Sequence, residues 1–120
     1  MSSSSYLDPM SIAVIEHDVF GESLISWSYP KLRENSEILC PQISRNLMDH
    51  KYFCYRYKNT WTYVISHQLD KRRLSDIQCI SICILTEKYA PQQYETLLHI
   101  LMTSYIRSEQ NPIKILEIYL

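Results

Sequence analysis

The sequence predicts an α+β fold, in which one five-stranded and mainly antiparallel sheet is covered by helices on both faces. Three observations carry this prediction. Two apolar runs near the N-terminus flank a tight turn that contains the chain's one glycine, Gly21. From Lys51 onward the apolar period becomes two, and after Pro91 it becomes helical. The resulting order of elements is β-β-α-β-β-β-α-α.

The first predicted unit is a hairpin of strands 10–17 and 22–29. Its turn, Asp18-Val19-Phe20-Gly21, places the glycine where a tight turn can need a positive φ. The run from Ile12 to Ile15 has no polar interruption, which is typical of a strand that is covered on both faces. Pro30 cannot donate a hydrogen bond to a neighbouring strand, so we expect the second strand to end there.

The segment 31–49 has apolar residues at mainly helical spacing, interrupted by Pro41. These residues are Leu32, Ile38, Leu39, Ile43, Leu47 and Met48. Two arrangements fit the pattern: two helical pieces hinged near the proline, or a loop followed by a helix.

A second hairpin is indicated by aromatic residues that alternate from Lys51 to Ser66 around a polar turn at Lys58-Asn59. In this hairpin Trp61 and Tyr63 share one face, which we interpret as core rather than as a partner surface. The next apolar run, Ile77 to Thr86, is rich in isoleucine and favours a central strand.

Two helices complete the predicted fold. Pro91 suits the first helical position, and it is followed by a one-sided apolar stripe made of Tyr94, Leu97, Leu98, Leu101, Met102 and Tyr105. Asn111 and Pro112 read as the N-cap and first residue of the last helix. Because that helix is apolar nearly all round, we expect it to meet a partner surface or further chain.

Length and composition favour one ordinary globular domain. The chain has 120 residues, 46 % hydrophobic and 21 % charged, which we divide into a mobile lead, 1–9, and a domain, 10–120. Twelve basic residues are matched by 13 acidic ones, so a nucleic-acid partner is not expected. There is no apolar run of about 20 residues and no signal-like N-terminus, so we expect a cytoplasmic protein.

No catalytic, cofactor or metal constellation stands out. A single glycine leaves no phosphate-cradling loop, and the four cysteines form no C-x-x-C pair, so we interpret them as buried thiols. Histidines 17, 50, 67 and 99 are scattered singly, and we expect strand-end or surface positions for them. We therefore predict no cofactor and no enzyme activity for the chain by itself.

The order of elements describes a longin-like α-β-α sandwich, and profilin-like folds share much of it. Four segments resemble the N-terminal longin-like (upstream DENN) module of DENN-domain proteins, a likeness that runs from about Ser11 to Leu120. They are S-I-A-V-I-E-H-D-V-F-G-E-S-L-I-S-W-S-Y-P at 11–30, Y-K-N-T-W-T-Y-V at 57–64, I-S-I-C-I-L-T at 80–86 and P-I-K-I-L-E at 112–117.

This resemblance implies a role in small-GTPase biology. DENN proteins act as guanine-nucleotide exchange factors for Rab GTPases, or as effectors and scaffolds at endosomes. The implied partners are a Rab-family GTPase, a Commander-like endosomal trafficking complex and the second DENN lobe of the same protein, which this chain lacks. The implied location is peripheral on endosomes. Without the second lobe, the chain is not expected to have exchange activity. The alternative is a structural adaptor without exchange activity.

Two groups of residues are candidates for a partner interface. The last helix offers Ile113, Leu116, Tyr119 and Leu120, for packing against the missing lobe or another copy. The run Lys71, Arg72 and Arg73 is a candidate contact with anionic lipid or an acidic GTPase surface. Three basic residues in a polar loop are more often only a solvated connection, so both interpretations of this run stay open.

Overall fold

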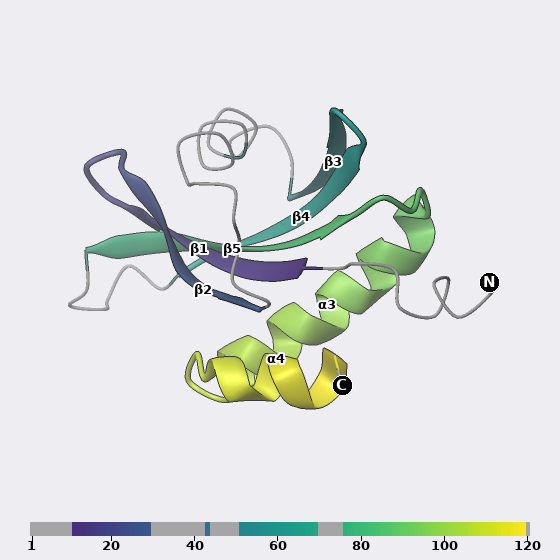
Figure 1. Ribbon diagram of the computed structural model, residues 1–120. Helices are drawn as coiled ribbons and strands as arrows, with labels where there is room; N and C mark the ends of the chain where they lie inside the picture. The colour runs from purple at the N-terminus through teal and green to yellow at the C-terminus, as the bar shows by residue number, and fades with distance from the viewer. Residues whose placement is uncertain (1–10, 30–42, 44–50, 70–75, 120) are drawn as a thin grey trace.

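The computed structural model describes residues 11–29, 43, 51–69 and 76–119. Its centre is a five-stranded sheet with the strand order β2-β1-β5-β4-β3, and every neighbouring pair is antiparallel. Helices α3 and α4 lie together on one side of this sheet (Figure 1). The predicted α+β class with one five-stranded antiparallel sheet is thus confirmed.

Strands β1 (Ser11–Asp18) and β2 (Ser23–Tyr29) form the first hairpin. Gly21 has a φ of 86°, as its position in the turn predicts. The Asp18 carboxylate fixes this turn, because its Oδ1 accepts the backbone N–H groups of Phe20 and Glu22 at 2.9 Å each. The hairpin is therefore held both by backbone pairing and by a local side-chain bond.

Strands β3 (Tyr52–Tyr57) and β4 (Thr60–Gln68) form the second hairpin, joined at Lys58-Asn59 as predicted. Strand β5 (Ile77–Thr86) lies between β1 and β4, which explains why seven of its ten residues are buried. The prediction of a central strand from its continuous apolar run is confirmed.

Helix α3 (Pro91–Arg107) begins at the predicted proline, and helix α4 (Pro112–Tyr119) begins after Asn111. The Asn111 Oδ1 accepts the backbone N–H of Ile113 at 3.0 Å, which confirms the expected N-cap. The buried stripe of α3 holds Tyr94, Leu98, Leu101, Met102 and Tyr105.

Each face of the sheet has its own hydrophobic cluster. The larger cluster joins one face to the two helices, and its fully buried members include Ile82, Leu101 and Ile115. The smaller cluster lies on the other face and holds Ala13, Ile15, Ile43, Val64 and Cys83. Ile43 is helical and fully buried there, so a residue of the segment 31–49 covers the second face.

Several predictions concern residues outside the described part of the chain. These are the mobile lead 1–9, the two alternatives for 31–49 apart from Ile43, and the basic run Lys71, Arg72 and Arg73. They stay predictions.

Candidate partner-binding surface

Helices α3 and α4 form the outer surface on one side of the sheet. Tyrosines of the sheet hold α3 in position. The Tyr63 hydroxyl donates to the Lys88 carbonyl and accepts the Ala90 N–H, both at 2.9 Å. The Tyr52 hydroxyl donates to the Pro91 carbonyl at 2.8 Å. The N-cap residue Ala90 offers no side-chain bond of its own, so these tyrosines anchor the start of α3 to β3 and β4.

Burial raises the pKa of the hydroxyls of both Tyr52 and Tyr63. The two side chains therefore stay neutral, and each hydroxyl remains able to donate to a carbonyl at the start of α3. The rings of Tyr63 and Tyr94 also stack, with their centroids 4.7 Å apart. Hydrogen bonding and ring packing thus fix α3 at the same place.

Helix α4 folds back beside α3 through an unusual connection. Glu109 and Gln110 both have positive φ values, 58° and 65°, although neither is glycine. The Gln110 N–H bonds the Tyr105 carbonyl at 2.7 Å, which closes the end of α3. Ile115 then enters the larger cluster and is fully buried. This connection fixes which side of α4 faces the core.

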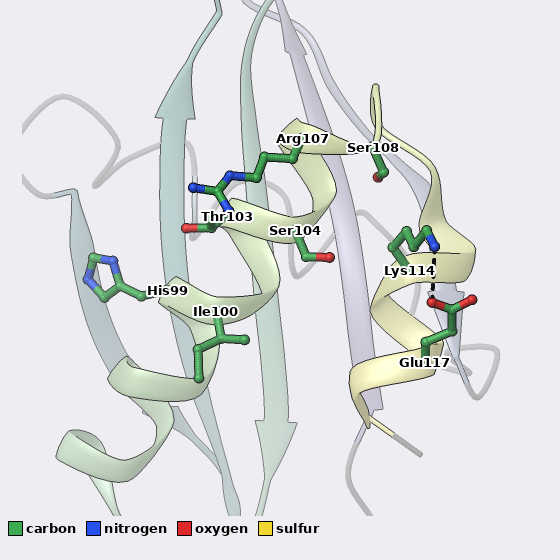
Figure 2. A pocket seen from close by; sticks show the side chains of 8 residues that line it. All are labelled: His99, Ile100, Thr103, Ser104, Arg107, Ser108, Lys114 and Glu117. Carbon is green, nitrogen blue, oxygen red and sulfur yellow. Dashed lines mark hydrogen bonds and ion pairs between the residues drawn. The ribbon is translucent and has the colours of Figure 1, made fainter.

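A groove of about 720 Å³ lies on the two helices, open to solvent. Figure 2 shows side chains from both helices around it, with Ile100 and Ser104 on α3 directed toward α4. Lys114 and Glu117 of α4 form an ion pair at 3.3 Å. The full lining is His99, Ile100, Thr103, Ser104, Arg107, Ser108, Lys114 and Glu117.

Exposed apolar side chains accompany this groove. Ile100 on α3 is 50 % exposed, and Ile113 and Ile118 on α4 are 59 % and 37 % exposed. On α4, the exposed Ile113 lies beside Lys114 and one turn before Glu117, both of which are also exposed, so this helix surface is mixed rather than purely apolar. A whole protein–protein interface is about as apolar as the rest of a protein's surface, so this mixed surface is compatible with a partner contact.

The structure describes the side chains of two of the four predicted interface residues on α4. Ile113 points to solvent, whereas Leu116 is partly buried. Tyr119 ends the helix, and its side chain lies outside the described part, as does Leu120. The groove residues of α3 were not among the candidates. The groove residues of α3, at positions 99, 100, 103, 104 and 107, recur at helical spacing on the side of α3 away from its apolar stripe. This spacing in the sequence is the signal that identifies the groove surface.

A buried polar network lies on the opposite face of the sheet. His17 Nδ1 lies 2.6 Å from Ser23 Oγ, His17 Nε2 lies 2.8 Å from Ser81 Oγ, and Ser81 Oγ lies 2.8 Å from Ser66 Oγ. His17 is next to the end of β1, as expected of a strand-end residue, but it is buried and not at the surface. Burial lowers the pKa of His17 to about 4.

This serine–histidine contact is structural and not a catalytic dyad. A nucleophilic serine and its base must reach the substrate, whereas Ser81 is fully buried and His17 is only 4 % exposed. The network instead satisfies polar groups inside the sheet, and no buried side-chain nitrogen or oxygen within the described ranges lacks a partner.

Other kinds of site find no support in the part of the chain that the structure describes. It contains no group of three His, Cys, Asp or Glu side chains that is suited to a metal ion. Cys79 and Cys83 are buried thiols as predicted, whereas Cys54 is only partly buried. None of the helices in these residues has the length and apolar character needed to cross a membrane.

Comparison with known proteins gives three informative relatives, although no family model matches the chain. The chain is 26 % identical to human (Homo sapiens) DENN domain-containing protein 10 over 116 residues, which cover 92 % of the chain and 32 % of the relative. The mouse (Mus musculus) and zebrafish (Danio rerio) proteins of the same name are 27 % and 25 % identical over the same share of the chain. The chain thus spans about a third of the length of these relatives. They confirm its resemblance to the DENN-domain proteins.

Proposed function

We propose that this chain is the longin-like lobe of a Rab-regulating protein that acts in endosomal membrane trafficking. The observation that carries the proposal is the similarity of 92 % of the chain to DENN domain-containing protein 10 of three vertebrates. The single five-stranded antiparallel sheet supports it, because this is the architecture expected of such a lobe. The proposed location is cytoplasmic and peripheral on endosomes.

The proposed mechanism is differential binding without covalent chemistry. A protein that binds the nucleotide-free Rab more tightly than the nucleotide-bound Rab shifts the equilibrium toward nucleotide release. Such a function needs a rigid surface rather than a catalytic base, and α3 provides one because Tyr52 bonds its first residue to the sheet and Tyr63 bonds Lys88 and Ala90 just before it. The lobe by itself is proposed to be non-catalytic.

The second DENN lobe is the proposed occupant of the groove on α3 and α4. The groove offers apolar contact through Ile100 and a charged pair, Lys114 and Glu117, for orientation. The relatives are about three times as long as the matched segment, so they contain chain that is long enough to supply such a lobe. In this arrangement the Rab would bind to the two lobes jointly.

The experiment is a pull-down with a panel of purified Rab GTPases, each prepared nucleotide-free and GTP-loaded. The bait is the whole product of the gene that encodes this chain, with the 120-residue chain alone run in parallel. We expect the whole product to retain at least one Rab in its nucleotide-free form. If it retains none in either form, the proposal is wrong.

A second candidate is a structural adaptor that docks on an endosomal trafficking complex of the Commander type. The solvent-exposed Ile113 and Ile118 favour it, because they offer a binding surface that needs no GTPase. Ile113→Asp should abolish co-precipitation of the complex and leave Rab retention unchanged if this candidate is right. Ile113 is the better position for this test than Leu116, since Leu116 is partly buried and an aspartate there would also disturb folding.

The matched control is Thr96→Asp, which places the same charge on an exposed position of α3 outside the groove. It should change neither measurement. Loss of Rab retention in Ile113→Asp, with the complex still bound, would instead favour the Rab-regulating lobe.

A further inference from the structure

A second hollow, of about 270 Å³, lies between the last turns of α3 and the sheet. It shares His99, Thr103 and Arg107 with the groove on α3 and α4. Figure 2 shows His99 and the Arg107 guanidinium extending from α3 to the side away from α4. The remaining lining is contributed by Lys51, the end of β4 (Ile65, Ser66 and His67) and two apolar residues of α3 (Met102 and Ile106).

Positive and hydrogen-donating groups converge in this hollow. Lys51 and Arg107 carry fixed positive charges, and His67 and His99 each offer a ring N–H. No Asp or Glu is among the described residues that line it. The formal net charge of the whole chain is −1, so this concentration of basic groups is a local feature and not a reflection of composition.

The two cations have no compensating partner within the described ranges. The ion pairs found there are His99 with Glu95, at 4.0 Å, and Lys114 with Glu117. Neither pair includes Lys51 or Arg107. Like charges that share a small hollow repel each other, and a bound anion would remove that repulsion.

Three apolar residues, Ile65, Met102 and Ile106, also line the hollow. Apolar walls lower the local dielectric constant and so strengthen the attraction between the rim and an anion. The Thr103 hydroxyl adds a neutral donor. The hollow thus combines several donors, two cations and apolar lining residues.

We propose that this hollow binds a phosphoryl group, carried by a soluble ligand or by a lipid headgroup. A phosphoryl group has three acceptor oxygens and a charge near −2, so it can accept bonds from donors that approach from several directions. A carboxylate offers two oxygens in one plane and a single charge, which matches this arrangement less well. Arginine binds such a group through its planar fork and lysine as a point charge. This inference does not depend on the proposed function.

The first test is a ¹H–¹⁵N NMR titration of the chain with inorganic phosphate, at constant ionic strength and with acetate as the competing anion. We expect saturable shifts at the amides of Lys51, Thr103 and Arg107 with phosphate, and much smaller shifts with acetate. Shifts of equal size with both anions, or shifts that do not saturate, would mean an adventitious ion only and overturn the proposal.

Matched variants distinguish phosphate binding in this hollow from nonspecific attraction of an anion to basic residues elsewhere on the chain. Lys51→Gln combined with Arg107→Gln should weaken phosphate binding by about tenfold or more, because two charge-assisted bonds are lost. Both positions are exposed, so the unbound spectrum should keep the dispersion of the folded chain. Lys88→Gln removes an exposed lysine outside the hollow and should leave the affinity unchanged. Unaltered binding in the double variant contradicts the proposal.

Two further arms identify the source of the phosphoryl group. One measures binding to a soluble inositol phosphate, and the other measures sedimentation with phosphatidylcholine vesicles that contain either a phosphatidylinositol phosphate or phosphatidylserine. Binding to the soluble inositol phosphate alone, dependent on Lys51 and Arg107, assigns the phosphoryl group to a soluble ligand. Binding that also occurs with the phosphoinositide vesicles, with the same dependence, assigns it to a lipid headgroup. Absence of both, or equal sedimentation with phosphatidylserine, would refute a phosphoryl site.

Discussion

At the scale of single residues, His17 has the most definite physical signature. Its neutral ring bridges Ser23 and Ser81 inside the sheet, and burial lowers its pKa to about 4, from about 6.5 in an unfolded chain. Between these two values the unfolded chain binds a proton that the folded chain does not. The His17 contribution to stability is therefore complete above about pH 6.5 and is lost as the pH falls toward 4.

Chemical denaturation at several pH values measures this effect. The free energy of unfolding should fall by up to about 1.4 kcal/mol per pH unit between pH 6.5 and 4, beyond the contribution of the carboxylates. His17→Gln should lose this additional dependence, whereas His99→Gln, at an exposed position, should keep it. The same pH dependence in His17→Gln as in the unmodified chain would show that the buried ring does not titrate as described.

At the scale of elements, the bonds of Tyr63 hold the start of α3 on the sheet. Tyr63→Phe keeps the ring stacking on Tyr94 but leaves the Lys88 carbonyl and the Ala90 N–H without their partner. We expect a loss of about 1–3 kcal/mol in the free energy of unfolding, measured by denaturant titration. Tyr57→Phe removes a hydroxyl from a more exposed tyrosine and should change stability by less than about 0.5 kcal/mol. Equal losses in the two variants would contradict the role given to Tyr63.

Helix α4 offers a matched pair of isoleucines that tests its orientation. Ile115 is fully buried, and Ile113 is 59 % exposed on the same helix. Ile115→Ala should cost about 2–5 kcal/mol, because it removes buried methyl groups and leaves a cavity. Ile113→Ala should stay within about 0.5 kcal/mol. Thermal or denaturant unfolding of both variants decides the question, and a larger loss at Ile113 would mean that α4 is rotated.

The elements that the sequence predicts well are those whose signal is local. Two of these signals are patterns of residues: the continuous isoleucine run of β5 and the alternating aromatic residues of β3 and β4. The third is a stereochemical restriction, the proline at the start of α3. Asn111 as the cap of α4 is a further local signal. Such features depend on neighbours within a few residues, so they can be predicted from the sequence without knowledge of the tertiary structure.

The features that the sequence did not predict depend on distant partners. His17 and Ser81 are 64 positions apart, and only the pairing of β1 with β5 brings them together. The groove on α3 and α4 depends on positive φ values at Glu109 and Gln110, which are residues that seldom adopt them. The hollow proposed for a phosphoryl group is lined both by Lys51, just before β3, and by Arg107, at the end of α3, so it depends on the packing of α3 on the sheet.

At the scale of the whole molecule, two hydrophobic clusters on opposite faces make the sheet the rigid centre of the lobe. In the proposed function the two clusters serve only to stabilise the fold. The partner contacts lie on the outer surfaces of α3 and α4. A rigid lobe loses little conformational entropy on association, which suits a protein that acts through binding alone. The sequence resemblance to DENN domain-containing protein 10 and the proposal of a protein that acts through binding are thus consistent with each other.

The most direct test of this account is the ratio of two dissociation constants. The whole gene product is titrated with one retained Rab, first nucleotide-free and then GDP-bound, by calorimetry or by optical biosensor. Exchange by differential binding predicts a nucleotide-free complex that is tighter by about a hundredfold or more, equivalent to about 2.7 kcal/mol. Equal affinity for the two forms would contradict the account, because a protein that binds both states equally shifts no equilibrium.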